Sequence, residues 1–424
     1  MKPILIVHGG AGDIPESRVQ GKLHGVKVAV REGYKVLSKN GSALDAVEAA
    51  VVSMENDEYF NAGYGSVLNL AGEVEMEASI MSGKDLDVGA VTLVKDFLHP
   101  ISIAHKVLTD SPHSLLGGQG AKEFALEKGF QPVPPESLIS DNAKAALNDF
   151  LKHGEFGRTE IGIAEGGVGT VGAVAIDAEG RIAVATSTGG MSGKAVGRIG
   201  DTPQIGSGTY ADDNIGGVST TGHGESILKY CLAHSIVKLM EKGIDAATAT
   251  KDAVTGMTSR LKNTAGAITL SKDGDVGLYF SSKRMSWAYI KGDLEKKLLD
   301  VTKQNLIINR KLKLDILLDY QRGTRGEINS RSLVQELAKA VPDQCKLSLY
   351  QTPRLQGSWS KALPARYNEI VGLQHMKLYI ADDSVILSGA NCSNDYFQNR
   401  QDRYIEIQDV DLANFYCELI GMTV

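Results

Sequence analysis

The order of apolar and polar positions along the chain predicts alternating strands and helices. Ile4–Val7 is a continuous apolar run, which is typical of a buried strand, and the glycine-rich turn at residues 8–12 would end it. Residues 73–78 alternate with a period of two, which indicates a half-buried strand. Ser42 is a predicted N-cap for the helix that follows it. Apolar side chains at helical spacing predict helices at residues 16–39, 43–54, 101–108 and 119–128.

The pattern changes between residues 130 and 168 and then resumes. Three prolines and the glycine-rich run at 165–169 make this stretch linker-like, apart from a polar helical piece near 142–152. Residues 170–177 form a strongly apolar strand, which a turn returns to 182–186 as a hairpin. Further helices are predicted at 224–242 and 245–262, and further strands at 88–94, 267–271 and 276–280. Helices on both sides of antiparallel strands predict a layered α/β sandwich.

Glycine usage divides the chain into two parts. Residues 1–293 contain 41 of the 47 glycines, and residues 294–424 contain only 6. The second part is also α/β, with strands predicted at 313–318, 345–350, 376–380 and 384–388 and helices predicted at 294–308, 330–340 and 411–421. We therefore predict two modules, residues 1–291 and 293–424.

Charge and cysteine usage exclude several classes of protein. The net charge is −6, and residues 294–424 carry 17 Lys+Arg against 16 Asp+Glu, so neither part resembles a nucleic-acid-binding surface. The four cysteines are scattered without a CxxC pair, which argues against a zinc ribbon or a disulfide scaffold and fits a reducing compartment. We find no presequence and no apolar run of about 18 residues, so the expected location is the cytoplasm, without a transmembrane segment.

Thr170 opens the apolar strand directly after the glycine-rich run, and this position suggests a particular chemistry. A free N-terminal threonine can act as nucleophile and base at once, because its hydroxyl attacks while its own α-amine takes the proton. Such an amine has a pKa of about 7.7–8, which suits proton transfer near neutral pH. The amine becomes available only if the Gly169–Thr170 bond is cut. The alternative is that Thr170 is a β-branched residue that simply begins a strand.

Seven sequence blocks give residues 1–291 a resemblance to a known family. The blocks are His8–Gly12, Phe60–Ser66, Met76–Met81, Gly169–Val174, Ala185–Gly190, Gly197–Asp201 and Ser219–Glu225. In this order they resemble the plant-type asparaginase and isoaspartyl peptidase family of N-terminal nucleophile hydrolases. The resemblance implies an αββα sandwich and hydrolysis of L-asparagine and β-aspartyl dipeptides. It also implies a homodimer of αβ heterodimers, with no cofactor apart from a structural sodium ion.

The resemblance also implies roles for individual residues. Thr170 matches the nucleophile, which autoproteolysis frees by cutting between Gly169 and Thr170, and Thr188 matches the hydroxyl that helps to orient it. Arg198 and Asp201 match the groups that bind the α-carboxylate and α-amine of the substrate. The remaining matches are Thr221 and Gly222 at the oxyanion site, Gly224 in the substrate pocket, Asn61 beside the scissile bond, and the segment from Met54 to Gly63 as a loop that binds sodium through backbone carbonyls.

Two other patterns in this part suggest alternatives. His8 and His223 lie in glycine-rich turns and could belong to a serine–histidine triad. The stretch Gly206–Thr209 is similar to a phosphate-binding loop but lacks the lysine of a P-loop. We favour the reading in which the glycine stretches line a pocket with backbone.

The second module contains an HxKxxxxD pattern, formed by His375, Lys377 and Asp382, with Asn391 downstream. His375 and Lys377 would share one face of a strand, which places an imidazole beside a phosphate-binding ammonium. A core histidine with a solvated lysine is the alternative. The blocks Ile316–Gly326, Asn329–Arg331, Gly372–Lys377, Leu387–Asn391 and Tyr396–Tyr404 resemble part of phosphatidylglycerophosphate synthase, a member of the phospholipase D superfamily.

That second resemblance implies a partial phospholipase D-like α/β domain with one motif where the superfamily uses two. The implied reaction is transfer of a phosphatidyl group from CDP-diacylglycerol to glycerol 3-phosphate, with a phospholipid or nucleotide-lipid as partner and the mitochondrion as location. Three hypotheses stay open. The chain is a threonine-type amidohydrolase with an appended fragment, it is a hydrolase fused to a working phosphatidyltransferase, or its tail is an inactive passenger.

Overall fold

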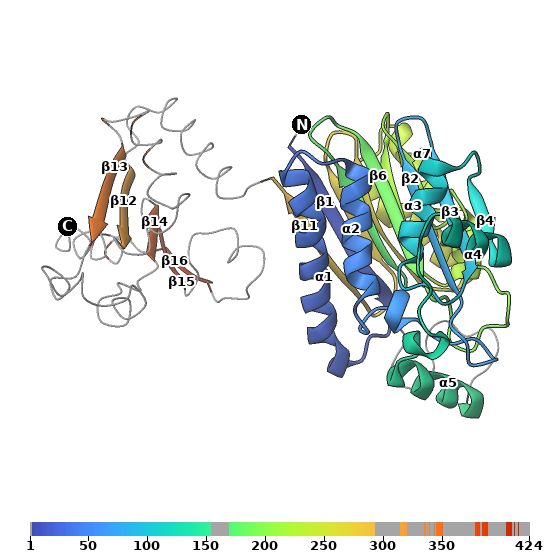
Figure 1. Cartoon of the computed structure of the whole chain (residues 1–424). Coiled ribbons are helices and arrows are strands. Elements are labelled where there is room, and N and C mark those ends of the chain that lie inside the picture. Colours follow the sequence, from blue (N-terminus) through green and yellow to red (C-terminus); the bar gives the residue numbers. More distant parts are fainter. Residues whose placement is uncertain are drawn as a thin grey trace, which may run out of the picture. The chain divides into compact units, whose positions relative to one another are not determined.

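The computed structural model describes residues 2–153 and 169–292 and, beyond them, 314–319, 335, 339, 343, 345–350, 378–381, 384–388, 404–408, 411 and 414. The chain divides into two compact units, Met1–Lys291 (unit 1) and Gly292–Val424 (unit 2) (Figure 1). Among the described residues, no helix combines the length and the apolar character that crossing a membrane requires.

Unit 1 contains two β-sheets. The seven-stranded sheet has the order β11-β1-β5-β6-β2-β3-β4, and its strands are β1 (Ile4–Gly12), β2 (Met76–Ser82), β3 (Val88–Val94), β4 (Leu115–Gly117), β5 (Val171–Ile176), β6 (Ile182–Thr188) and β11 (Arg284–Lys291). The four-stranded sheet has the order β10-β9-β8-β7, and its strands are β7 (Thr209–Asp212), β8 (Gly216–Gly222), β9 (Ala265–Ser271) and β10 (Val276–Phe280). Every printed pairing in these sheets is antiparallel except that of β3 with β4.

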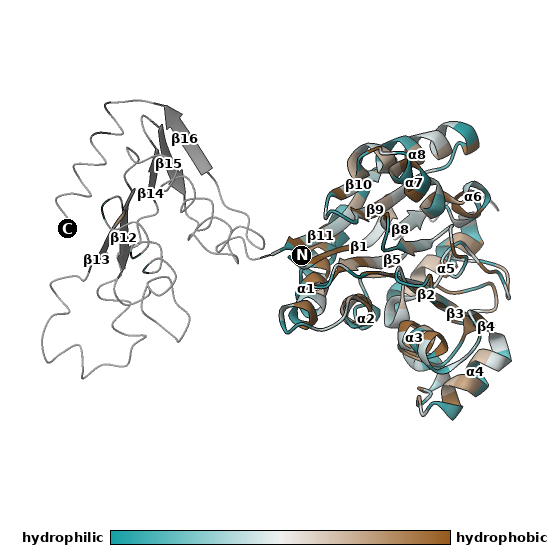
Figure 2. Ribbon diagram, turned by 90° about the horizontal axis from the view of Figure 1, so that it is seen from above, coloured by the Kyte–Doolittle hydropathy of each residue, from teal (hydrophilic) through white to brown (hydrophobic). Residues whose placement is uncertain are grey.

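Helices cover the outer faces of both sheets. The described helices of unit 1 are α1 (Glu16–Ser38), α2 (Ala43–Glu55), α3 (Pro100–Asp110), α4 (Gly118–Glu127), α5 (Asp141–His153), α6 (Gly224–Tyr230), α7 (Leu232–Glu241) and α8 (Ala246–Leu261), with short 3₁₀ turns η1 (Gly63–Gly65) and η2 (Pro135–Leu138). One apolar cluster packs α1–α4 on the large sheet, and another packs α7 and α8 on the small sheet. A third cluster fills the space between the two sheets. Figure 2 shows the resulting order of helix, sheet, sheet and helix.

Because both faces of the large sheet are covered, its central strands are buried on both sides. In β1, Leu5 and Val7 face the helices, whereas Ile4 and Ile6 face the second sheet. The prediction of a half-buried strand at 73–78 is therefore wrong in two respects. The strand is Met76–Ser82, and its residues are buried on both faces except at the last position.

Some of the other predictions for unit 1 are confirmed, and others are wrong. The N-cap prediction is confirmed, since Ser42 Oγ accepts the N–H of Asp45 at 3.1 Å, and the 170–186 hairpin corresponds to β5 and β6. The strand at residue 4 does not end at the turn, because β1 continues to Gly12 after a bulge between His8 and Ala11. The helix predicted at 224–242 is broken at Cys231, which has a left-handed φ of 50°. Strands β4, β7, β8 and β11 were not predicted.

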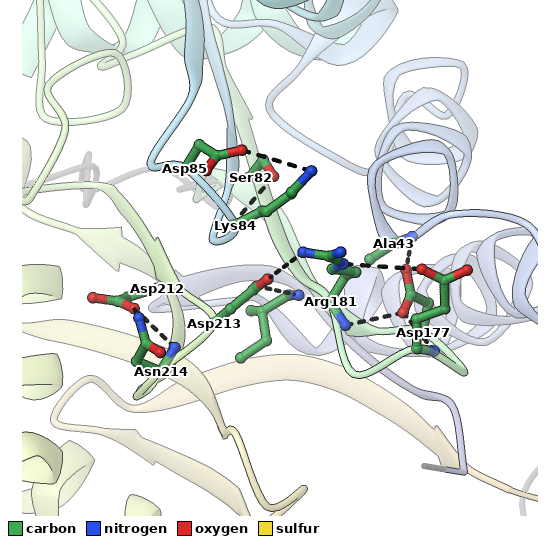
Figure 3. A network of polar contacts seen from close by, with 11 residues as sticks. Ala43, Ser82, Lys84, Asp85, Asp177, Arg181, Asp212, Asp213 and Asn214 are labelled. Atoms are coloured by element: carbon green, nitrogen blue, oxygen red, sulfur yellow. Dashed lines mark hydrogen bonds and ion pairs between the residues drawn. The ribbon is translucent and has the colours of Figure 1, made fainter.

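Polar groups tie the strands together where β5 turns into β6 (Figure 3). Asp177 accepts the backbone N–H groups of Arg181 at 3.0 Å and of Ala43, at the start of α2, at 3.2 Å. Asp213, in the turn between β7 and β8, accepts the N–H of Ile182 at 2.7 Å and lies 3.7 Å from the Arg181 guanidinium. These bonds connect the two sheets at the end opposite to the start of β5.

The described strands of unit 2 form two small sheets. Strand β12 (Leu314–Asp319) pairs in parallel with β13 (Cys345–Tyr350). Strands β14 (Leu378–Ala381), β15 (Ser384–Ser388) and β16 (Tyr404–Gln408) are antiparallel neighbours. The first four agree with predicted strands, and β16 was not predicted. The helix predicted at 294–308 lies outside the described residues, as do nearly all residues of those predicted at 330–340 and 411–421.

Candidate active site

Thr170 and Thr188 meet where β5 begins and β6 ends. The Thr170 hydroxyl donates to Thr188 Oγ1 at 3.2 Å, and Thr188 Oγ1 also accepts the N–H of Gly190 at 3.0 Å. Both threonines are buried. The backbone N–H fixes the position of Thr188 Oγ1, and this oxygen in turn fixes the direction of the Thr170 hydroxyl.

The Gly169–Thr170 peptide packs directly on the glycine-rich part of β1. Gly10 has a φ of +99°, and a Cβ placed on it would lie 2.5 Å from the Cα of Gly169. A Cβ on Gly169 would lie 2.8 Å from the Ala11 nitrogen, whose N–H donates to Thr221 Oγ1 at 3.2 Å. Backbone contact that close requires glycine on both sides. Ala11 thus connects Thr221, from the small sheet, to the chain beside Gly169.

Gly222 follows Thr221 at the end of β8. Its φ is +133°, and a Cβ there would lie 2.6 Å from the Cα of Ala265 on the neighbouring strand. Only glycine fits this position without a shift of the backbone. The chain can therefore leave the sheet at Gly222 and enter α6 two residues later.

Asn61 holds the turn that follows Thr188. Its Nδ2 donates to the carbonyl of Gly190 at 2.7 Å, and its Oδ1 accepts the N–H of Val67 at 3.0 Å. Its backbone oxygen accepts the N–H of Gly189 at 3.0 Å. The side chain is fully buried. These bonds connect Asn61 to the nucleophile region through Thr188.

Arg198 lies in a cradle of three glycines. A Cβ on Gly190, Gly200 or Gly224 would lie 3.2, 2.6 or 2.5 Å, respectively, from a nitrogen of its guanidinium group. The Nε of Arg198 donates to Glu225 Oε1 at 2.9 Å. Because this bond uses Nε, the two terminal nitrogens of the Arg198 guanidinium are left for a bidentate contact with a carboxylate.

Asp201 reaches the same pocket from the other side. A Cβ on Gly224 would lie 2.8 Å from Asp201 Oδ1, so Arg198 and Asp201 converge over this glycine. Burial raises the pKa of Asp201 to about 7. The positive charge of Arg198 acts to lower this pKa, and the negative charges of Glu77 and Glu225 act to raise it further. A fixed cation beside a buried carboxyl group can recognise the two charged ends of an amino acid.

Glu77 and Lys194 are pocket residues that the sequence did not reveal. Both oxygens of the buried Glu77 accept the N–H of Gly200 at 3.0 Å. The buried Lys194 donates to the carbonyl of Glu75 at 2.7 Å, and a Cβ on Gly190 would lie 3.0 Å from its Nζ. Burial raises the pKa of Glu77 and lowers that of Lys194, although the two charges attract each other. Glu77 lay in the alternating stretch at 73–78, whose pattern indicated a half-buried strand and not a buried carboxylate.

Each of the two histidines considered for a triad lies within hydrogen-bond distance of a serine. His8 is fully buried, and its Nε2 lies 2.9 Å from Ser219 Oγ, which is also fully buried. Burial lowers the pKa of His8 to about 3, although a hydrogen bond with the Thr170 backbone acts in the opposite direction. The ring is therefore neutral near pH 7. His223 Nδ1 lies 2.7 Å from Ser226 Oγ in α6.

The segment predicted to bind sodium, from Met54 to Gly63, begins inside a helix and not in a loop. Met54 is the second-last residue of α2, and its fully buried side chain belongs to the apolar cluster between the helices and the large sheet. Its carbonyl accepts the N–H of Asp57 at 3.1 Å, in the turn that ends the helix. The first two residues of the segment are therefore helical, and the loop starts after Glu55. Sodium binding by the carbonyls of this segment stays a prediction.

The remainder of this segment and the turn after it bring carbonyl oxygens together. A Cβ on Gly63 would lie 2.2 Å from Glu55 O, and one on Gly65 would lie 2.0 Å from Phe60 O and 3.0 Å from Glu58 O. The Arg18 guanidinium also donates to Glu58 O, at 2.8 Å. Carbonyl oxygens are suitable donors for a hard cation, and sodium binding by this segment stays a prediction.

Another group of possible metal ligands lies on α2 and α3. Asp45, Glu48 and His105 each place one ligand atom within 4.8 Å of the others. His105 Nδ1 lies 2.6 Å from Glu48 Oε2, and the Ser42 hydroxyl donates to Asp45 Oδ2 at 2.7 Å. An ion pair between helices and a helix cap explain these contacts without a metal.

The motif residues of unit 2, His375, Lys377, Asp382 and Asn391, lie outside the described residues. The roles predicted for them, and the resemblance to a phosphatidyltransferase, stay predictions.

Comparison with known proteins places unit 1 among hydrolases. The family model described as Asparaginase matches residues 1–299. The probable isoaspartyl peptidase/L-asparaginase CG7860 of Drosophila melanogaster is 48% identical over 307 residues, which cover 68% of this chain and 92% of the fly protein. The isoaspartyl peptidase/L-asparaginase of Xenopus laevis is 48% identical over 293 residues, covering 69% and 94%. The human protein of the same name is 46% identical over 292 residues, again covering 69% and 94%.

Proposed function

Because this chain belongs to the asparaginase family, we propose that unit 1 hydrolyses L-asparagine and β-aspartyl (isoaspartyl) dipeptides with Thr170 as an N-terminal nucleophile. The observation that carries the proposal is the convergence of Thr170, paired with Thr188, and the Arg198–Asp201 pocket around one glycine-rich turn. The names of the relatives supply the two substrate classes.

The first step is cleavage of the chain itself. The Thr170 hydroxyl attacks the carbonyl carbon of Gly169, and the peptide nitrogen leaves as the α-amine of Thr170 while an ester forms at its oxygen. Water then hydrolyses the ester and leaves a carboxylate on Gly169. The tight packing of Gly169 on Gly10 supports this step, because it restrains the scissile peptide beside the attacking residue.

The freed threonine then acts on the substrate. Its hydroxyl attacks the side-chain carbonyl carbon of asparagine, its α-amine takes the hydroxyl proton, and that proton passes to the leaving ammonia. Water hydrolyses the resulting acyl ester, which releases aspartate and restores the hydroxyl. A β-aspartyl dipeptide reacts in the same way, with the amine of an amino acid as leaving group.

The substrate is held by its amino-acid end. The terminal nitrogens of Arg198 bind the α-carboxylate, and Asp201, once ionised, binds the α-ammonium group. Gly224 leaves room for both contacts, since a side chain there would collide with both groups. The Thr221 hydroxyl and the Gly222 N–H stabilise the oxyanion that forms during attack, and one such donor contributes about 2.7–4 kcal/mol.

A sodium ion in the loop that follows α2 would stabilise the site without taking part in the chemistry. The carbonyls of Glu55, Glu58 and Phe60 would hold it. The loop joins α2 to the residues around Asn61, so the ion would fix the position of the Asn61 side chain. We also propose a cytoplasmic homodimer of cleaved chains, which size-exclusion chromatography and fractionation would test.

The HxKxxxxD residues of unit 2 remain a separate hypothesis. If unit 2 is a working phosphatidyltransferase, the protein should consume CDP-diacylglycerol, and His375→Ala should abolish this turnover without affecting asparagine hydrolysis. Turnover that survives the substitution would exclude the second site, and a wild-type protein without turnover would exclude the second activity.

Ammonia release and dipeptide cleavage by the purified full chain test the proposed function. Wild-type protein should release ammonia from asparagine and cleave a β-aspartyl dipeptide, and Thr170→Ala should do neither. Wild-type protein that hydrolyses neither substrate would contradict the proposal.

A further inference from the structure

The side chains between the two sheets change character from one end of the sandwich to the other. Deep in the interface they are apolar, and the facing residues include Ile4, Ile6, Met81, Val174, Ile176, Ile182, Val184 and Ala211. Two residues further along each strand, towards the start of β5, the next residue on the same face is polar or is a glycine. These next positions are His8, Ser79, Gly172, Thr186 and Thr209.

The four polar residues of this set and Ser219 of β8 form a continuous hydrogen-bonded chain, which we call the hydroxyl layer: His8, Ser79, Thr186, Thr209 and Ser219. Each is fully buried. His8 Nε2 lies 2.9 Å from Ser219 Oγ, which lies 2.8 Å from Thr186 Oγ1. Thr209 donates to Thr186 Oγ1 at 2.7 Å, and Ser79 Oγ lies 2.8 Å from Thr209 Oγ1.

The layer occupies a single register level of both sheets. In the large sheet His8 is opposite Gly172, Gly172 is opposite Thr186, and Thr186 is opposite Ser79. In the small sheet Thr209 is opposite Ser219. All four hydrogen bonds of the chain therefore cross from one sheet to the other at the same level.

The catalytic residues lie one level above the layer. Thr188 follows Thr186 by two residues on β6, and Thr221 follows Ser219 by two residues on β8. Both pairs therefore share a face of their strand. Thr170 precedes Gly172 by two residues, and a Cβ on Gly172 would lie only 2.0 Å from Ser219 Oγ. The layer therefore lies directly beneath the proposed site residues of both sheets, Thr170 and Thr188 on the large sheet and Thr221 on the small sheet.

One end of the layer reaches the substrate pocket. Ser79 donates to the carbonyl of Thr202 at 2.6 Å, and Thr202 is the residue directly after Asp201. The opposite end is His8, beside the start of β5. The chain therefore spans the interface from the nucleophile to the residue that would bind the substrate amine.

Stability alone does not explain this arrangement. Apolar side chains fill the next level deeper in the interface, and replacing a buried polar pair by such groups is often nearly neutral for stability. Hydrogen bonds differ from apolar contacts because they fix distances and angles. A catalytic group must be held within about 0.5 Å of its productive position, and here the groups belong to two separate sheets.

We propose that the hydroxyl layer is a positioning element of the active site, which sets the spacing of the two sheets so that Thr221 faces Thr170 and Thr188. The reaction on which it acts is the proposed hydrolysis, so the inference rests on that function. Thr186 is the central member, because it bonds to both residues of the small sheet.

Two substitutions at Thr186, one of equal shape and one that keeps the hydroxyl, test the proposal. Thr186→Val removes the hydroxyl and keeps the branched side chain, whereas Thr186→Ser keeps the hydroxyl. We expect Thr186→Val to lower kcat by roughly ten- to a hundredfold, as displacements of about 1 Å do, with KM changed less than threefold. Thr186→Ser should recover most of the loss.

The chain offers a matched control on the other face of the small sheet. Thr269 on β9 is fully buried and accepts a hydrogen bond from Thr250 of α8 at 2.7 Å. Its neighbour across the strands, Val218, belongs to the cluster beneath α7 and α8. Thr269→Val should lower the melting temperature about as much as Thr186→Val does and leave kcat unchanged.

Two readouts on each variant separate the inference from the proposed function. The readouts are dipeptide hydrolysis and the rate at which the chain is cut at Gly169–Thr170. Active wild-type protein with an equally active Thr186→Val variant would overturn the positioning role alone. The positioning role would also be overturned if Thr269→Val lowered kcat as much as Thr186→Val does. It would be overturned as well if Thr186→Ser lost as much kcat as Thr186→Val. Wild-type protein that neither cuts itself nor hydrolyses the dipeptide would overturn both.

Discussion

The side-chain oxygens of Thr170 and Thr188 lie 3.2 Å apart, and the hydroxyl of Thr170 is the donor. Thr188 is itself held by the N–H of Gly190. The proposed nucleophile therefore has its hydroxyl oriented by a neighbouring strand before any substrate arrives.

Removing the acceptor should disorder the nucleophile. Thr188→Val leaves the Thr170 hydroxyl without this partner in a buried place, so we expect kcat to fall by roughly a hundredfold, in the range of a single positioned catalytic group. Thr188→Ser retains the oxygen and should stay within about tenfold of wild type. Steady-state kinetics with a β-aspartyl dipeptide checks this, and equal activity of the two variants would contradict the role of Thr188.

The contact between Gly10 and Gly169 should be essential for self-cleavage. In Gly10→Ala the new methyl group would collide with the Gly169 backbone at a φ of +99°, so the scissile peptide must move. We expect little or no cleavage on a denaturing gel. Gly72→Ala is the control, since Gly72 has a similar φ of +76° with open space around it. It should carry only the backbone strain, about 1–3 kcal/mol, and should be cleaved normally.

The substrate pocket should be sensitive to one added methyl group. Gly224→Ala would place a Cβ against both the Arg198 guanidinium and Asp201 Oδ1. We expect KM to rise by roughly tenfold or more, about 1.4 kcal/mol of lost binding. Gly120→Ala in α4 is a suitable control, because nothing lies within 4 Å of the added Cβ and alanine is the better helix former. A Gly224→Ala variant with unchanged KM would place the amino-acid end of the substrate elsewhere.

Asp201 should give substrate binding a pH dependence near neutrality. Burial raises its pKa to about 7 in the free protein, so below that pH the group is protonated and cannot pair with an ammonium. A bound ammonium favours the carboxylate and lowers its pKa. We therefore expect KM for asparagine to rise by about tenfold per pH unit below pH 7. The value of kcat should fall over the same range for a separate reason, because protonation of the Thr170 α-amine removes the base. A constant KM between pH 5.5 and 8 would contradict the assignment of Asp201 to the substrate amine.

Local sequence signals predicted much of unit 1 because they need no knowledge of the partner strand. Ser42 identifies the start of α2, and the apolar run after Thr170 identifies β5. The quoted motifs also lead to residues that the fold brings together, such as Thr170, Thr188 and Arg198. The order of these motifs in the chain does not predict which residues meet, because the contacts join strands that are far apart in sequence, such as β1 with β8.

The failures have long-range causes. Strand β11 was not predicted, because it is recognisable by its pairing with β1 rather than by its own pattern. Glu77 suggested a solvent-facing position within an alternating stretch, but the strand is covered on both faces and the carboxylate bonds to Gly200. The hydroxyl layer could not be foreseen, because its five members come from five strands and meet only across the two sheets.

The most direct test of the account is the mass of the purified wild-type chain under denaturing conditions, measured beside Thr170→Ala. The account predicts two fragments for the wild type, one ending at Gly169 and one beginning at Thr170 with a free α-amine, and a single intact chain for the variant. An intact wild-type chain that still hydrolyses asparagine would contradict the N-terminal threonine mechanism, as would a cut at any other bond.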